Sequence, residues 1–298
     1  MDRYSGATST GVQASSPPQD MGKTTEFRLT DQDFHKISDL VHKMTGIVLK
    51  EEKKVLVYSR LAKRLRALNM QTFKEYCVFL EGASGKEEMT SFINAITTNL
   101  TRFFREIHHF DHIKNVVIPY LVEKYQRELT TQAKRIRILS AGCSSGEEPY
   151  SLAMVLATHL PPGFDVKILA TDIDTNMLST GKKGLYQSIQ GVPPEYMHFC
   201  IKQPQGGYMM APQIAQMITF NPLNLLHNWP MKGEFQAIFC RNVVIYFNKE
   251  TQSNIFNRMA PLLASDGWLL IGHSESLFKV CDHFQLKGQT IYQKEMST

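Results

Sequence analysis

The stretch Ser140–Ser151, "SAGCSSGEEPYS", combines a glycine-containing turn with two carboxylates directly after the β-leaning run "KRIRIL". Gly142 and Gly146 allow the backbone to approach a ligand closely, and a helix beginning just after them would point free N–H groups toward it. A dinucleotide-binding turn has G-x-G-x-x-G spacing, whereas the spacing here is "GCSSG". A diphosphate would also be repelled by Glu147 and Glu148. The turn therefore favours a ligand that carries a cationic group, with a tight strand–helix connection as the alternative.

A further carboxylate, Asp172, lies in "ATDID", where the next strand is expected to end. A carboxylate at this place in an α/β sheet can accept hydrogen bonds from both hydroxyls of a ribose. Asp174 is expected to cap the following helix, which is a structural role. Nicotinamide enzymes share this combination, but a ligand with a ribose, a positive centre and no phosphate is S-adenosylmethionine. We predict this cofactor, with Glu148 facing the ammonium group of its methionine end.

A third group of polar residues follows the apolar run in "FCRNVVIYF", Phe239 to Phe247. Arg241 and Asn242 project at the carboxyl end of this expected strand, and Tyr246 comes a few residues later. A buried arginine needs a partner, so one interpretation is a salt bridge to a neighbouring helix. The other is a lining of the cofactor cleft, which the convergence of three candidate strand ends favours.

The segment "TTNLTRFFRE", Thr97 to Glu106, places Asn99, Thr101 and Arg105 among apolar residues between two units of the chain. A segment between domains is a common place for ligand contacts. A linker with an aromatic anchor is the alternative when the segment is taken alone.

The carboxyl ends of strands meet only if a sheet brings them together, and the second part of the chain predicts one. The runs "RIRILSAG", "KILATDI", "FQAIFCRN" and "GWLLIGHSE" are typical of strands and alternate with helical stretches, and "GQTIYQKE" is expected to close the sheet. Such alternation implies βαβ units and a mostly parallel sheet, an α/β fold, over residues 98–298. Ligands in such sheets bind at the carboxyl ends of the strands.

Residues 26–97 predict a small all-helical domain before the sheet. Thr30 and Asp33 form a capping signal, apolar residues then recur at helical spacing, and Gly46 ends the first helix. Further helices are expected over about 52–68, 72–80 and 86–97. Residues 1–25 are rich in Ser, Thr, Gly and Pro and are expected to form a flexible extension.

Two other segments complete the organisation. A helical stretch from Glu106 to Glu128 is expected before the first strand. Residues from about 187 to 219 do not follow the alternation, because they are rich in Gly, Pro, Gln and Met. Short runs such as "GGYMMA" and "QMITF" predict a small antiparallel β-subdomain inserted there.

The composition is that of a soluble globular protein with mild positive charge. The 298 residues are 43% hydrophobic and 20% charged, with a formal net charge of +5. No apolar run approaches the about 20 residues that span a bilayer, and the N-terminus lacks the apolar core of a secretory signal. Five cysteines without a C-x-x-C pair indicate reduced thiols in a cytoplasmic protein. His108, His109 and His112 cluster without an acidic ligand pattern, so no metal site is predicted.

The second expected helix carries a charge run of one sign. From Lys53 to Arg66 it has six basic residues and no acidic one, and Lys53, Arg60 and Arg64 share one side. The ordinary interpretation is a solvated face, but the lack of an acidic residue at i,i+4 favours an acidic partner. Nucleic acid is a competing ligand. The modest total charge and the lack of interleaved aromatic residues argue against it.

Taken together, these motifs resemble one family, the chemotaxis receptor methyltransferases known as CheR. The matching text is "TTNLTRFFRE", "SAGCSSGEEPYSLAM", "ATDIDTNML", "NPLNLL", "FCRNVVIYF" and "GHSE", and the resemblance runs from about Leu29 to Tyr292. It implies a helical N-terminal domain, then a Rossmann-like S-adenosylmethionine-dependent methyltransferase domain with a small inserted β-subdomain. It also implies methylation of glutamate side chains on the cytoplasmic helical bundle of chemoreceptors, giving glutamyl methyl esters.

The resemblance assigns roles to residues of this chain. The implied cofactor shell is Asn99, Thr101, Arg105, Glu148, Asp172, Asn224, Leu225, Arg241 and Asn242. Arg105 and Tyr246 fall where the family places residues near the transferred methyl group, and we expect Arg105 to orient the substrate carboxylate or to bind the cofactor carboxylate. The receptor bundle becomes the expected partner of Lys53, Arg60, Lys63 and Arg64, rather than nucleic acid or a membrane.

A second receptor contact is known in part of the family. Members whose β-subdomain binds a peptide at the receptor's C-terminal tail carry a longer glycine-containing loop there. The loop here, "CIKQPQGGYMMA", is shorter, so we expect a member that does not need the tethering peptide. Three rival functions remain at this stage: a nicotinamide-dependent oxidoreductase, a nucleic-acid methyltransferase and a non-catalytic receptor-binding relative.

Overall fold

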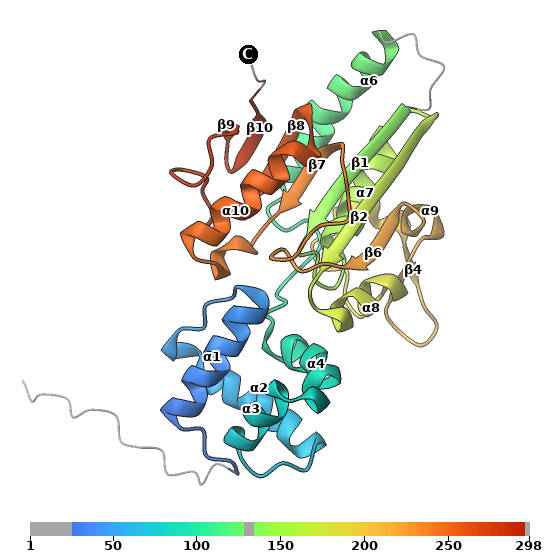
Figure 1. Cartoon of the computed structure of the whole chain (residues 1–298). Helices are drawn as coiled ribbons and strands as arrows, with labels where there is room; N and C mark the ends of the chain where they lie inside the picture. The colour runs from blue at the N-terminus through green and yellow to red at the C-terminus, as the bar shows by residue number, and fades with distance from the viewer. Residues whose placement is uncertain (1–25, 128–133, 296–298) are drawn as a thin grey trace, which may run out of the picture.

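The computed structural model describes residues 26–127 and 134–295, so the extension predicted over residues 1–25 lies outside the described residues. A bundle of helices forms one body, and a larger body is built on a sheet whose strands β1 and β2 point toward the bundle (Figure 1). Within the described residues, no helix is both long and apolar enough to cross a bilayer.

The bundle follows the predicted helices closely. It consists of α1 (Asp31–Thr45), α2 (Lys54–Ala67), α3 (Phe73–Glu81) and α4 (Lys86–Ile96). The predicted capping box is confirmed, because Thr30 Oγ1 accepts from the N–H of Asp33 and the Asp33 carboxylate accepts from the N–H of Thr30, each at 3.1 Å. Gly46 ends α1 with a left-handed φ of 74°. The inward faces meet in one core that includes Phe34, Ile37, Leu61, Leu65, Phe73, Tyr76 and Phe92.

The helical stretch predicted from Glu106 to Glu128 is present from His108 up to Arg127, the last described residue before the gap. It runs through α5 (His108–His112), a π-helical turn η3 (Ile113–Val117) and α6 (Ile118–Arg127). Glu106 itself is not helical, since its φ is +57°. This left-handed residue turns the chain from the linker into α5.

The sheet confirms the prediction of a mostly parallel α/β fold. Its order is β6-β2-β1-β7-β8-β10-β9, parallel from β6 to β8 and antiparallel at β10 and β9. The strands are β1 (Lys134–Ala141), β2 (Phe164–Asp172), β6 (Ile218–Pro222), β7 (Phe235–Cys240), β8 (Leu263–Ile271), β9 (Phe284–Gly288) and β10 (Ile291–Lys294). β10 is the predicted closing strand, whereas β9 was not predicted because four of its five residues are exposed.

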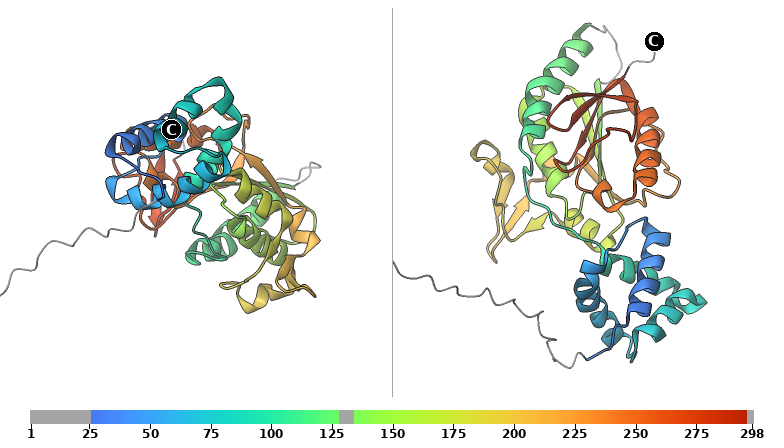
Figure 2. Two further views of the ribbon diagram at one scale, coloured as in Figure 1. Left: turned by 90° about the horizontal axis from the view of Figure 1, so that it is seen from below. Right: turned by 90° about the vertical axis from the view of Figure 1, so that its left-hand side faces the viewer.

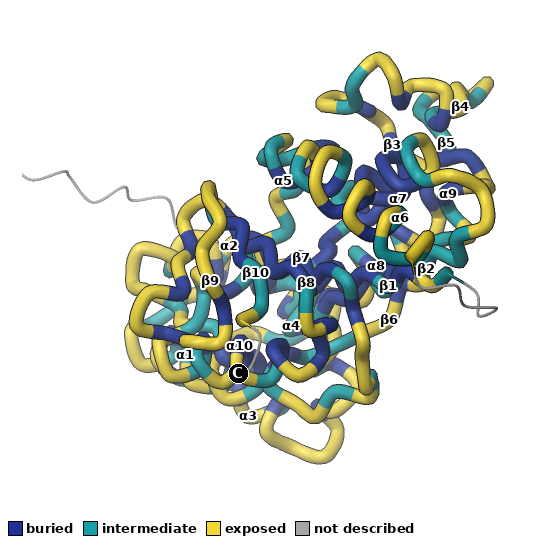
Figure 3. The backbone as a smooth tube through the Cα atoms, turned by 90° about the horizontal axis from the view of Figure 1, so that it is seen from above, coloured by how far each residue is buried: buried dark blue, intermediate teal, exposed yellow. Residues whose placement is uncertain are grey.

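Helices cover both faces of the sheet, so its central strands are buried (Figure 3). Ile138 on β1 belongs to a core shared with α5, α6 and α7 (Glu147–His159). The next residue, Leu139, belongs to a second core shared with α10 (Lys249–Met259). Successive side chains of a strand point to opposite faces, which explains this division.

The segment between β2 and β6 begins with α8 (Thr175–Lys183), which packs against β2 and β6 of the main sheet. The rest of the segment forms a small subdomain beside the sheet, which projects from the body in the right-hand view of Figure 2. The subdomain contains β3 (Leu185–Tyr186), η4 (Pro194–Phe199), β4 (Cys200–Lys202), β5 (Tyr208–Met210) and α9 (Pro212–Ala215). The antiparallel sheet β3-β5-β4 includes "YMM", as expected. The assignment of "QMITF" to this insertion is wrong, because Ile218–Pro222 pairs in parallel with β2 at the edge of the main sheet.

The two bodies are joined by hydrogen bonds as well as by the linker. Asn94 on α4 donates to Thr175 Oγ1 at 2.9 Å and accepts from the N–H of Thr175. Asn224 donates to the carbonyl of Met44 at 2.7 Å, at the end of α1. These contacts fix the bundle over the carboxyl ends of the parallel strands, where a cleft lies between the two bodies.

Candidate active site

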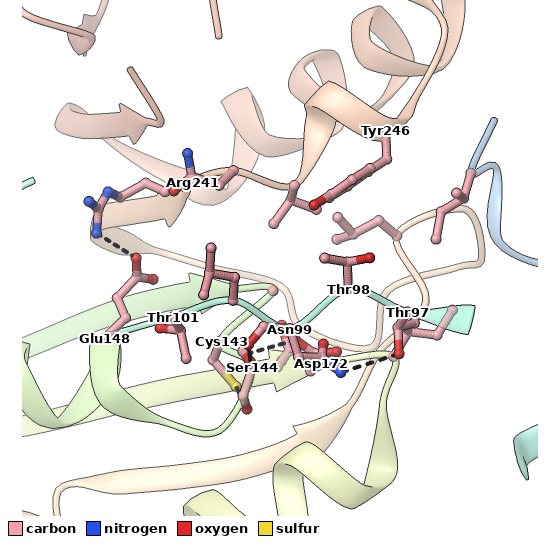
Figure 4. Close-up of a pocket in the computed structure, with 18 of the residues that line it drawn as sticks. Thr97, Thr98, Asn99, Thr101, Cys143, Ser144, Glu148, Asp172, Arg241 and Tyr246 are labelled. Carbon is pink, nitrogen blue, oxygen red and sulfur yellow. Dashed lines mark hydrogen bonds and ion pairs between the residues drawn. The ribbon is translucent and has the colours of Figure 1, made fainter. Parts of the chain in front are cut away.

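One cleft gathers side chains from the linker, from the ends of β1, β2 and β7, and from the bundle (Figure 4). It holds about 980 Å³ of atom-free space, its open mouth included. All ten residues that the sequence analysis placed at the cofactor or the methyl group line it: Asn99, Thr101, Arg105, Glu148, Asp172, Asn224, Leu225, Arg241, Asn242 and Tyr246. Their individual roles stay predictions.

The glycine turn is shaped by its neighbours in the protein. Gly142 has a φ of +78°, and a Cβ there would lie 2.2 Å from Cγ2 of Val243. The N–H groups of Gly142 and Cys143 both donate to the carbonyl of Thr171, at 2.7 and 2.9 Å. The glycine is therefore needed for close packing against the β7 loop, and the turn is tied to the end of β2.

Glu148 is the carboxylate of the turn that faces the cleft. Its Oε1 accepts from Ser140 Oγ at 2.7 Å, and its Oε2 accepts from Arg241 Nη1 at 2.9 Å. Arg241 thus fulfils both interpretations of the sequence, since it lines the cleft and forms a salt bridge to a neighbouring helix. Figure 4 shows this pair at one end of the cleft, with Tyr246 on the wall opposite Asn99.

Glu106 is a charged residue that the sequence analysis did not assign. Its Oε2 lies 3.1 Å from Arg241 Nη2, and its Oε1 lies 2.8 Å from His273 Nδ1. Burial alone would raise the pKa of this carboxyl, but the hydrogen bond from His273 and the charge of Arg241 outweigh it and hold the pKa at about 2. Its position directly after Arg105, at the end of a polar linker, was the available signal.

Asp172 is held by the backbone at the end of β2. Its carboxylate oxygens accept from the N–H groups of Ser144 and Asp174, both at 2.8 Å. Burial raises its pKa. The capping role predicted for Asp174 is confirmed, because its Oδ1 accepts from the N–H groups of Asn176 and Met177 at the start of α8.

The linker is bound to the ends of β1 and β2. Asn99 donates from its side-chain amide to Asp174 Oδ2 at 2.7 Å, and its backbone carbonyl accepts from Ser144 Oγ at 3.1 Å. Arg105 donates from Nη1 to the carbonyl of Leu100 at 2.8 Å. Both side chains therefore combine a position in the cleft wall with a structural bond.

The loop that carries Arg241, Asn242 and Tyr246 is fixed by Glu275, a second residue that the analysis of the sequence missed. The Glu275 carboxylate is buried and accepts N–H bonds from the following residues: Asn242, Val243, Val244, Ile245 and Gly272. Burial raises its pKa, because no cationic side chain contacts it among the described residues. The motif "GHSE" contains this residue but does not by itself reveal what it binds.

Asn224 and Leu225 line the cleft, and Asn224 joins it to the bundle. The amide of Asn224 donates to Met44, and its Oδ1 accepts from the N–H of Leu226 at 3.0 Å. Leu225 is buried in the core under α10. These residues shape the wall of the cleft and join it to the end of α1.

Two of the basic residues of α2 that the sequence predicted to contact a partner also bond to groups within the bundle. Arg64 makes two hydrogen bonds to Glu88 on α4, at 2.7 and 2.6 Å, so it has an acidic partner within the bundle itself. The partner is 24 residues away, beyond the reach of i,i+4 reasoning. Arg60 donates to the carbonyls of Ile96 and Thr97, both at 2.7 Å.

Other basic side chains remain available for a partner. Lys53 and Lys63 have no ion pair within residues 26–127 and 134–295. Lys63 borders one surface pocket with Arg60 and Arg64, and Lys53 borders a second with Arg60 and Tyr246. The four predicted substrate-binding residues thus lie outside the cleft lining, and the pocket that Lys53 and Arg60 border shares Ile47, Thr98 and Tyr246 with the cleft.

The histidines and cysteines add no metal-binding group among the described residues. His109 is buried, and burial lowers its pKa to about 3, while His112 packs edge-on against Trp268 with ring centroids 4.3 Å apart. The five cysteines are free thiols.

Comparison with known proteins gives matches over both bodies. Residues 32–97 match a family model described as "CheR methyltransferase, all-alpha domain", and residues 99–293 match "CheR methyltransferase, SAM binding domain". The chain is 40% identical to the chemotaxis protein methyltransferase of Salmonella typhimurium, covering 90% of this chain and 92% of that protein. It is likewise 40% identical to that of Escherichia coli (90% and 93%) and 39% identical to chemotaxis protein methyltransferase 2 of Pseudomonas aeruginosa (93% and 98%).

Proposed function

The chain belongs to the CheR family of methyltransferases, and on this premise we propose that it transfers a methyl group from S-adenosylmethionine to glutamate side chains of chemoreceptors. The product would be a glutamyl methyl ester, formed on the cytoplasmic helical bundle of the receptor and serving chemotactic adaptation. The observation that carries the proposal is the convergence of Arg105, Glu148, Asp172 and Tyr246 on one cleft at the carboxyl ends of the strands.

The groups in the cleft suit this cofactor in charge and in hydrogen bonding. Glu148 offers a carboxylate to the α-ammonium group, and Asp172 offers acceptor oxygens to the ribose hydroxyls. Arg105 offers a cationic side chain in the cleft wall to the carboxylate of the methionine end. A diphosphate beside the turn would meet Glu148 with charge repulsion, which disfavours a nicotinamide cofactor.

The reaction needs little help from a general base. A glutamate side chain has a reference pKa of about 4.3 and is ionised at neutral pH. Bound S-adenosylmethionine supplies a sulfonium methyl; the glutamate oxygen forms the new bond to its carbon as the carbon–sulfur bond breaks, which leaves S-adenosylhomocysteine. Because the attacking anion and the sulfonium cation neutralise each other, the contribution of the protein is mainly alignment and exclusion of water.

Two side chains would provide this alignment. Arg105 would orient the incoming carboxylate or hold the carboxylate of the cofactor, and Tyr246 would donate a hydrogen bond near the reacting centre. Tyr246 borders both the cleft and the neighbouring surface pocket that contains Lys53 and Arg60. It therefore stands between the proposed cofactor site and the proposed path of the substrate.

The receptor would be held mainly by the basic side of α2. Lys63, together with Lys53 just before α2, supplies charge that no ion pair occupies within the described residues, while Arg60 and Arg64 also bond to other groups of the bundle. An acidic helical bundle fits this surface better than nucleic acid, because the one aromatic residue of α2, Tyr58, packs against Phe73 in the bundle instead of alternating with the charges. The short loop between β4 and β5 supports a mode of binding that does not depend on a tethering peptide.

The proposal is tested by incubating the protein with receptor-containing membranes and S-adenosylmethionine labelled in its methyl group. We expect label on the receptor that base releases as methanol. Label on added nucleic acid would replace the proposal with a nucleic-acid methyltransferase. Receptor binding with no transfer of label would leave a non-catalytic relative, and binding of NAD in place of S-adenosylmethionine would indicate an oxidoreductase.

A further inference from the structure

Arg241 lies between two carboxylates in the wall of the cofactor cleft. One guanidinium nitrogen is 2.9 Å from Glu148, and the other is 3.1 Å from Glu106. The side chain of Arg241 is 2% exposed, and those of Glu106 and Glu148 are 11% and 12% exposed. Charges this far from water are weakly screened, so their sum matters for any ligand next to them.

The pair of Arg241 with Glu148 is electrically neutral. A neutral pair has little attraction for the ammonium group that the proposed function places against Glu148. The second carboxylate changes this balance, because Glu106 is ionised at neutral pH and restores one negative charge to the trio. The charges of the neighbouring groups, from Glu106 through Arg241 and Glu148 to the ammonium group of the ligand, then alternate in sign.

We propose that Glu106 is a positioning residue for the cofactor, which neutralises Arg241 so that Glu148 keeps its charge for the α-ammonium group. The inference rests on the proposed function, since it assigns the methionine end of S-adenosylmethionine to this end of the cleft. It goes further in naming a residue outside the cleft lining as the one that sets the selectivity for a zwitterion.

The backbone around Glu106 supports this assignment. Arg241 also donates to the carbonyl of Arg105, the residue before Glu106. Arg105 Nε is 4.0 Å from Glu106 Oε1, and its side chain lines the cleft. The cleft therefore presents a cation at Arg105 and an anion at Glu148, which match the carboxylate and the ammonium group of an amino acid.

His273 explains why Glu106 stays in place. Its Nδ1 lies 2.8 Å from Glu106 Oε1, which leaves Oε2 facing Arg241. The imidazole is on the outer side of the cluster, with 66% of its side chain exposed. It holds the carboxylate without reaching the cleft.

The test compares two ligands on Glu106→Gln. S-adenosylhomocysteine carries the ammonium group, and the probe of the charge effect is its analogue in which hydrogen replaces the α-amino group. We expect calorimetry to show binding of S-adenosylhomocysteine weakened by about tenfold, and binding of the analogue changed by less than about threefold. A purely structural role of Glu106 would weaken both ligands equally, and that outcome overturns the proposal, as does unchanged binding of both.

A matched control is Glu147→Gln, the same chemical change at the adjacent position. Glu147 accepts from Ser145 Oγ and makes no ion pair with Arg241 within the described residues. We expect its ratio of affinities for the two ligands to equal that of the wild type. An equal loss of this ratio in Glu147→Gln would show a general charge effect and overturn the assignment to Glu106.

Two further measurements separate the possible failures. If the wild type binds no S-adenosylhomocysteine, the proposed function itself fails, whereas normal wild-type binding with no change in ratio sinks only the role of Glu106. Should Glu106→Gln not fold, Glu106→Asp replaces it as the test variant, because it keeps the negative charge. Its ratio of affinities for S-adenosylhomocysteine and the analogue must stay within about twofold of the wild-type ratio. A ratio in Glu106→Asp as low as in Glu148→Gln would overturn the proposal.

Discussion

The N–H of Val48 donates to the carbonyl of Tyr246 across 2.9 Å, and this bond joins the bundle to the loop that carries the proposed catalytic tyrosine. Val48 follows the end of α1, so the bundle is fixed to the cleft by its own backbone as well as by the linker. The position of Tyr246 therefore depends on how the bundle docks. The predictions below start from the side chains that this docking brings together.

Glu148→Gln should weaken binding of S-adenosylmethionine by about tenfold or more, because the amide cannot pair with the ammonium group. The variant keeps its acceptor toward Ser140, so the protein should remain folded. Calorimetry measures the affinity and thermal unfolding checks the fold. Normal affinity in a folded variant would show that the carboxylate of the turn is not used for the cofactor.

Arg105→Ala and Tyr246→Phe should each lower kcat for methyl transfer, by roughly 10- to 100-fold, since both act on alignment at the reacting centre. If Arg105 instead binds the cofactor carboxylate, its variant should raise the KM for S-adenosylmethionine more than it lowers kcat. Steady-state kinetics with receptor-containing membranes separates these cases. Unchanged transfer in both variants would contradict the proposed roles.

Glu275→Gln should destabilise the protein by about 1–3 kcal/mol and reduce methyl transfer, because the amide replaces an oxygen that accepts N–H bonds from the Arg241–Tyr246 loop. Urea unfolding and kinetics measure the two effects. The matched control is Glu250→Gln on the exposed start of α10, which should change neither. If the two variants have equal stability and equal methyl transfer, Glu275 does not hold the loop in place.

The stability difference between the wild type and Glu106→Gln should depend on pH. The pKa of Glu106 is about 2 in the folded protein, below the ordinary value of 4.5 for a glutamate side chain, so its ionised form favours folding. This contribution, on the order of 3 kcal/mol at neutral pH, is complete above about pH 4.5 and is lost as the pH falls toward 2. Urea titrations at a series of pH values measure it; a difference that stays constant from neutral pH to below pH 4 would refute it.

Charge reversal on α2 should separate receptor contact from stability. Lys63→Glu should weaken binding to receptor-containing membranes, increasingly so at low salt, while leaving thermal stability unchanged. Arg64→Ala should instead destabilise the protein by about 2 kcal/mol or more, since it leaves the buried Glu88 without its cation. Receptor binding that ignores both salt and Lys63→Glu would count against α2 as the docking surface.

Much of the framework followed from local pattern. The capping box at Thr30, the stop at Gly46 and the cap at Asp174 are set by residues within a few positions of one another, so the sequence alone predicted them. The parallel sheet was predictable for a similar reason, because alternating strands and helices allow few arrangements. The family motifs then pointed to ten residues that the structure places in one cleft.

Tertiary structure decided what those residues contact. Glu106 and Arg241 are 135 positions apart in the numbering, and Glu275 meets a loop about 30 residues earlier, so no periodicity links them. The same holds for Arg64 and Glu88. Arg64 was predicted to bind the substrate, and the structure shows that it also forms an ion pair within the bundle. Strand β6 joined the main sheet because an edge of β2 offered backbone partners. A buried charge takes its partner from whichever element packs against it, and packing is a property of the whole fold.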